Sequence, residues 1–124
     1  MEDIIKPLSS RKEVLFAFLF GSAARGEASS LSDVDIGVFL DPSLSEEDML
    51  EVLMEIASQL KVGTKGDLVL LNKASPSLAF EVIRGRALVV RDERALKEFV
   101  HRTLKIYHDR RHYDLRWARR ILSR

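Results

Sequence analysis

Four short runs of apolar residues along the chain are typical of buried strands. The first, EVLFAFLF at 13–20, is too short and too rich in aromatic and branched residues to favour a helix, and it stops at Gly21. The second, DVDIGVFL at 33–40, ends at the turn-forming dipeptide Asp-Pro. Two later runs, DLVLLN at 67–72 and RALVV at 86–90, are predicted as further strands.

Between these runs the apolar residues recur at helical spacing. Ser45 is a good N-cap, acidic residues fill the turn after it, and an apolar stripe follows at Met49, Leu50, Leu53, Ile56, Ala57 and Leu60. A shorter helix is predicted after Ser75, with Pro76 at its first position and Gly85 as its terminator.

A long amphipathic segment, rich in basic residues, ends the sequence. Its apolar stripe starts after Asp92, is interrupted at HDRRHYD and resumes towards the end, so we expect a basic helical segment over about 92–122. Because strands and helices alternate, the pattern predicts one α/β domain over residues 1–124, with helices packed on a small sheet.

Composition narrows the class of protein. The 124 residues contain no cysteine, which excludes a disulfide scaffold and a thiolate metal site. No apolar run reaches the roughly 20 residues that span a bilayer, and the first ten residues are acidic where a secretory signal would be basic. We therefore expect a cytoplasmic protein without a membrane anchor.

The net charge of +1 hides a strong asymmetry along the chain. Residues 1–83 carry 7 basic and 14 acidic side chains, whereas residues 84–124 carry 13 basic and 5 acidic ones. The basic end therefore favours an anionic neighbour: the acidic half of the same chain, a nucleotide, a nucleic acid or an acidic partner protein. Nucleic acid is disfavoured, because no nucleic-acid motif accompanies the basic residues.

Two aspartates stand at the edge of the second apolar run. On a strand, Asp33 and Asp35 point to the same side and repel each other unless a cation lies between them. Mg²⁺ fits this role because it prefers carboxylate and phosphate oxygens. Asp67, at the start of the next strand, is a candidate third ligand, and such a set could hold two ions for a displacement at phosphorus. A solvated turn or a helix cap is the alternative.

A glycine–serine pair precedes these aspartates by ten residues. Gly21 allows a tight turn and a close approach of the backbone, and Ser22 offers a hydroxyl group. The following AARGE could begin a helix whose free N–H groups face a phosphate. Arg25 is equally compatible with countering phosphate charge and with exposure to solvent.

Together these residues resemble a known family. The stretch GSAARGEASSLSDVDIGV is similar to the signature of the DNA polymerase β-like nucleotidyltransferases, and with DLVLLNKASP and RDERALKEFVHRTLKIYHD it resembles the minimal nucleotidyltransferases, the MntA-type antitoxins encoded beside HEPN-domain toxins. The resemblance covers about residues 10–113. It implies the polymerase β-like fold, a small mixed sheet flanked by helices.

The resemblance also implies roles for the residues named above. Gly21 and Ser22 would hold the triphosphate of ATP; Asp33, Asp35 and Asp67 would bind Mg²⁺, and Asp67 would help to activate the acceptor hydroxyl. AMP would pass to a tyrosine of a HEPN-domain toxin and silence it.

Two rival functions remain open at this stage. The chain could neutralise its partner by masking alone, against which the three retained aspartates argue. It could instead modify a small-molecule hydroxyl, against which we count the absence of an appended substrate domain. The sequence leaves the oligomeric state open, a homo-oligomer included.

Overall fold

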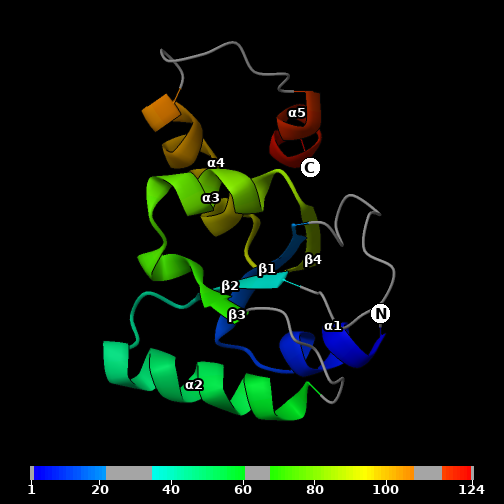
Figure 1. Ribbon diagram of the computed structural model, residues 1–124, viewed down its shortest axis with the longest axis vertical. Helices are drawn as coiled ribbons and strands as arrows, with labels where there is room; N and C mark the ends of the chain where they lie inside the picture. The colour runs from blue at the N-terminus through cyan, green and yellow to red at the C-terminus, as the bar shows by residue number, and fades with distance from the viewer. Residues whose placement is uncertain (1, 22–34, 61–67, 108–115, 124) are drawn as a thin grey trace.

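A four-stranded sheet with helices on both faces forms the centre of the molecule (Figure 1). The computed structural model describes residues 2–21, 35–60, 68–107 and 116–123. The strands are β1 (Val14–Phe20), β2 (Asp35–Leu40), β3 (Leu68–Leu70) and β4 (Arg86–Val90), in the order β3-β2-β1-β4. β1 runs antiparallel to β2 and β4, whereas β2 and β3 are parallel. The expected small mixed sheet is confirmed.

The helices divide between the two faces of this sheet. α1 (Glu2–Ser9) and α2 (Glu46–Gln59) pack on one face, and α3 (Pro76–Ile83), α4 (Glu93–Tyr107) and α5 (Arg116–Leu122) pack on the other (Figure 1). Side chains of β1 alternate between the two cores, with Ala17 and Leu19 facing α1 and α2 and the phenylalanines facing α3 and α4. Because both faces are covered, β1 is apolar along its whole length.

The predicted helix starts are confirmed. The side chain of Ser45 accepts a hydrogen bond of 3.0 Å from the Asp48 backbone N–H at the start of α2. Ser75 does the same for Leu78 at 3.2 Å, and Pro76 occupies the first position of α3. These caps satisfy backbone donors that have no partner inside the helix.

Two sequence-based predictions need correction. β3 (Leu68–Leu70) ends two residues before the end of the strand predicted over 67–72, because a 3₁₀ turn at Leu71–Lys73 follows it. The buried stripe of α2 consists of Met49, Val52 and Ile56, whereas Leu50, predicted to be buried, is 56% exposed, and Ala57 is exposed too. The helix therefore faces the sheet at a slightly different angle from the one we inferred from its apolar spacing.

The sequence analysis missed α1 altogether. This helix has only eight residues and contains Pro7, so its local sequence is a poor helix signal. Ile4 and Leu8, one turn apart, are both buried against the sheet and hold it in place. Tertiary packing therefore stabilises a helix that propensity alone does not favour.

The basic C-terminal segment joins the sheet through aromatic contacts. The Phe39 ring stacks on that of Phe16 at 4.8 Å between centroids, and Phe99 of α4 packs against both rings. Ile121 of α5 is buried in the same core. α4 and α5 both lie within the range of about 92–122 for which a helical segment is predicted, and residues 108–115 lie outside the described residues. None of the helices in the described residues is long and apolar enough to cross a membrane.

Candidate functional site

The end of β1 and the start of β2, the two central strands, meet at one end of the sheet. This end, where the strands begin or finish, is called the edge below. Phe20, the last residue of β1, pairs with Asp35, the first residue of β2. Gly21 follows at a φ of +78°, a left-handed conformation that side chains rarely adopt. The expected tight turn after β1 is therefore present, and it lies beside a half-buried carboxylate.

The absence of a side chain at Gly21 allows the Asp35 carboxylate to lie against the backbone. A Cβ atom built at Gly21 would be only 2.6 Å from Oδ2 of Asp35. Any larger residue would therefore have to displace that carboxylate. The neighbour of Gly21 is thus an aspartate of the candidate metal site, while the close approach of its backbone to a phosphate stays a prediction.

A second glycine holds β4 at the same edge. A Cβ atom at Gly85 would lie 2.1 Å from the carbonyl oxygen of Leu19, so only glycine fits between α3 and β4 at this point. Gly85 was predicted as the terminator of a helix, and α3 does end just before it, at Ile83 with Arg84 as its C-cap. Its further role, the close contact with β1, has no local sequence signal, because the contact joins residues far apart in the chain.

The start of β3 lies at this edge as well. Ile36 pairs with Leu68 in the parallel register of β2 and β3. Asp35 and Asp67 are the residues that immediately precede this pair in the sequence. The two strands are therefore neighbours, which is the condition for Asp67 to act as a third ligand.

The other candidate site residues, Ser22, Arg25, Asp33 and Asp67, lie outside the described residues. Within the described ranges, no group of three acidic or histidine side chains is placed to hold a metal ion. Asp35 offers the hard oxygen ligand that Mg²⁺ prefers, and the remaining donors of the predicted set are Asp33 and Asp67. The donor chemistry of this set suits Mg²⁺, while the roles of these residues stay predictions.

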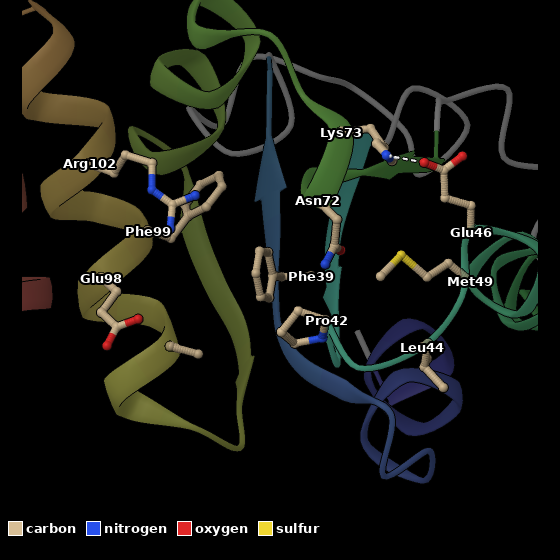
Figure 2. Close-up of a pocket in the computed structure, with 11 residues that line it drawn as sticks. Phe39, Pro42, Leu44, Glu46, Met49, Asn72, Lys73, Glu98, Phe99 and Arg102 are labelled. Atoms are coloured by element: carbon tan, nitrogen blue, oxygen red, sulfur yellow. Dashed lines mark hydrogen bonds and ion pairs between the residues drawn. The ribbon is translucent and has the colours of Figure 1, made fainter.

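A cavity of about 410 Å³ lies near the opposite end of β2, between α2 and α4 (Figure 2). Phe39 lies between its two walls, and four residues of strand, roughly 13 Å, separate Phe39 from Asp35. On one wall, Lys73 forms an ion pair with Glu46 and lowers the pKa of that carboxyl from its ordinary value. The opposite wall carries Glu98 and Arg102 from α4. This cavity is separate from the edge that carries Asp35.

The side chain of Asn72 forms two hydrogen bonds to the backbone of β2 beside this cavity. Its side-chain N–H donates to the carbonyl oxygen of Leu40, and its side-chain oxygen accepts from the Leu40 backbone N–H, both at 2.9 Å. These two bonds replace the strand pairing that β2 loses where β3 ends early. The sequence analysis did not single out Asn72, although it is the chain's only asparagine.

Comparison with known proteins gives a consistent result. Residues 2–94 match the family model described as Polymerase beta, Nucleotidyltransferase. This range contains Gly21, Asp35 and the four strands. No curated protein matches the chain significantly.

Solved structures of toxin–antitoxin complexes share the fold. A toxin–antitoxin complex with AMP-PNP is 28% identical with a TM-score of 0.65, and the match covers 87% of this chain and 86% of that one. An MntA–HpeT mutant, in which two aspartates two positions apart are replaced by glutamate, is 27% identical at 0.66, with 87% and 86% covered. A tri-AMPylated Shewanella oneidensis HEPN toxin in complex with MNT antitoxin is 27% identical at 0.60, with 87% and 83% covered.

Proposed function

Since the chain belongs to the polymerase β nucleotidyltransferase family, we propose that it is an antitoxin that transfers AMP from ATP to a tyrosine hydroxyl of a HEPN-domain toxin. The similar complexes support this proposal, because one contains AMP-PNP and another contains a tri-AMPylated HEPN toxin. The observation in this chain that carries it is the contact between Gly21 and Asp35, which places a carboxylate directly beside a tight glycine turn.

The glycine turn suits a triphosphate. With no side chain at Gly21, the backbone can approach phosphate oxygens closely, and Ser22 adds a hydroxyl donor. Arg25 is the candidate for countering the remaining phosphate charge. These residues would hold ATP with its α-phosphorus near the edge where β2 begins.

The carboxylates of Asp33, Asp35 and Asp67 would hold magnesium, in a site for two ions. Bound Mg²⁺ would offset negative charge on the phosphates during displacement at phosphorus. The donor set fits this ion, since it consists of hard carboxylate oxygens and the sequence offers no thiolate.

The transfer itself exchanges one phosphorus–oxygen bond for another. The tyrosine oxygen forms a bond to the α-phosphorus of ATP, the bond from that phosphorus to the β-phosphate oxygen breaks, and pyrophosphate leaves. Asp67 would accept the proton of the tyrosine hydroxyl as general base. In this proposal the toxin supplies the acceptor and the antitoxin supplies the nucleotide site.

Substitution of Asp35 tests the enzymatic part of the proposal. Asp35→Asn removes the charge that metal binding needs, so ATP-dependent labelling of the toxin should fall at least a hundredfold while the protein stays folded. Asp41→Asn is a matched control at the other end of β2, where the carboxylate accepts a 2.9 Å bond from the Ser43 N–H. The measurement is transfer of radiolabelled AMP, with thermal unfolding recorded in parallel.

The same assay separates the rival functions. Neutralisation of the toxin by Asp35→Asn without any transfer would show an antitoxin that acts by masking. Labelling of a small-molecule hydroxyl in place of the toxin would show the second rival. Either result would contradict the proposal.

A further inference from the structure

Three large apolar side chains are exposed in the part of the chain that the structure describes, and they form two separate patches. Leu50 and Met54 are 56% and 64% exposed and lie one turn apart on the outer face of α2. Ile106 is 45% exposed and lies in the last turn of α4. Contiguous exposed apolar surface, such as Leu50 and Met54 form together, commonly marks an interaction site, whereas Ile106 is a single exposed residue.

The two patches carry opposite charge. The fourteen residues of α2 include five acidic side chains and no basic one, and Glu47 and Glu51 lie beside Leu50 and Met54 on the exposed surface. Ile106 lies instead next to Lys105 and one turn from Arg102, both exposed. Each patch therefore combines an apolar centre with a charged border that complements the border of the other.

The two patches also lie at opposite ends of the molecule. α2 lies at one end of the longest axis, and the C-terminal end of α4 lies towards the other end (Figure 1). Arg102 also lines the cavity between α2 and α4, but Leu50 and Met54 lie on the outer face of α2. The apolar centres of the two patches of one molecule therefore cannot meet, whereas those of two molecules can. The net charge of only +1 means that two copies do not repel each other strongly as they approach.

We propose that the outer face of α2 docks the C-terminal end of α4 of a second copy of this chain. Leu50 and Met54 contact Ile106 of that copy, and Glu47 and Glu51 face its Arg102 and Lys105. Because different surfaces meet, the contact is head-to-tail: one copy keeps its α4 patch free and the other keeps its α2 patch free, so longer chains can form. The inference is independent of the proposed catalytic function.

Sedimentation velocity of the full chain as a function of concentration and salt tests this contact. Association should be visible at high protein concentration in 50 mM NaCl and weaken about tenfold or more in 500 mM NaCl, because the charged borders are screened. Leu50→Ser with Met54→Ser leaves the charge unchanged and should weaken association at least tenfold. A wild-type chain that stays monomeric, or a double serine variant that associates normally, would overturn the proposal.

A charge exchange between two variants identifies the partner surface. Glu47→Lys with Glu51→Lys, and separately Arg102→Glu with Lys105→Glu, should each abolish self-association. An equimolar mixture should associate, because the basic α4 end of the first variant can still dock on the acidic α2 of the second. The charge-reversed pair of surfaces is complementary as well. A mixture that stays monomeric would show that these surfaces do not meet and would contradict the proposal.

The control variant has the same net charge as the α2 variant, but its substitutions lie outside both patches. Glu81→Lys with Glu93→Lys carries the same net charge as the α2 variant but leaves both patches intact, so it should still associate with itself. The charge-exchange complex should depend on Leu50 and Met54: adding their serine substitutions to both variants should prevent it. Dimers that persist there would indicate attraction by net charge alone and would also overturn the proposal.

Discussion

The missing side chain of Gly21 allows the Asp35 carboxylate to lie against the turn that ends β1. Two separate constraints act on Gly21: its φ is positive, and a Cβ atom there would lie only 2.6 Å from Oδ2 of Asp35. The first constrains the backbone, and the second constrains the position of the carboxylate. A substitution at Gly21 should therefore affect both stability and the candidate chemistry.

Gly21→Ala should cost at least about 1 kcal/mol of stability, because alanine is strained at this φ. It should also reduce AMP transfer by more than this loss of folded protein explains, since the new methyl group displaces Asp35. Thermal unfolding and transfer rates, measured well below the melting temperature, separate the two effects.

Gly85→Ala is the matched control for this prediction. Its methyl group would clash with the Leu19 carbonyl oxygen, so it should lower stability strongly. Once corrected for the folded fraction, its transfer rate should exceed that of Gly21→Ala. Equal corrected rates would argue against a specific role for the contact between Gly21 and Asp35.

At the scale of elements, the Asn72 side chain takes the place of a strand. Its two 2.9 Å bonds satisfy both backbone groups of Leu40, whose side chain is fully buried. Buried backbone groups without partners are costly, so a single amide contributes substantially to the sheet. It also fixes the end of β2 beside the cavity of Figure 2.

Asn72→Ala should lower the free energy of unfolding by about 1–3 kcal/mol, because both bonds to Leu40 are lost. Urea unfolding measures this change directly. Gln59→Ala, which removes the exposed amide at the end of α2, should change stability by no more than about 0.5 kcal/mol. An equally small effect at Asn72 would mean that water replaces its bonds without cost.

Local sequence signals predicted the elements with strong periodicity or clear caps. The caps at Ser45 and Ser75 and the strand β1 belong to this class, since their causes lie within a few residues. α1 and the bonds of Asn72 were missed, because both depend on contacts with residues distant in the sequence. The exposed position of Leu50 was missed for the same reason.

For the candidate site, the sequence predicted the glycine turn and the proximity of the strand starts. Spacing alone suggested that Gly21 and Asp35 belong together, and the structure shows them in contact. The role of Gly85 at the same edge could not be predicted, because it depends on how α3 returns to β1. Ser22, Arg25, Asp33 and Asp67 remain sequence-based predictions.

At the scale of the whole molecule, acidic and basic side chains are concentrated on different helices. The acidic α2 and the basic C-terminal helices pack on opposite faces of the sheet. Arg119 and Arg120 of α5 are exposed, and neither forms an ion pair with another described residue. This exposure favours docking of the basic segment on an acidic partner over neutralisation within the chain.

Replacing Arg110, Arg111, Arg119 and Arg120 with glutamine should slow modification of the toxin by about tenfold at low salt. The melting temperature should stay unchanged, because charges that serve docking make little contribution to the stability of the chain alone. Stopped-flow association at several salt concentrations provides the measurement. A lower melting temperature with an unchanged association rate would instead show that these arginines neutralise the chain's own acidic half.

The central proposal is that this chain attaches AMP to a tyrosine of a HEPN-domain toxin. Its most direct test is the intact mass of that partner after co-expression with the wild-type chain and with Asp35→Asn, followed by peptide mapping. We predict a gain of one or more AMP units on tyrosine with the wild type and none with the variant. An unmodified partner that the wild-type chain nevertheless neutralises would contradict the account.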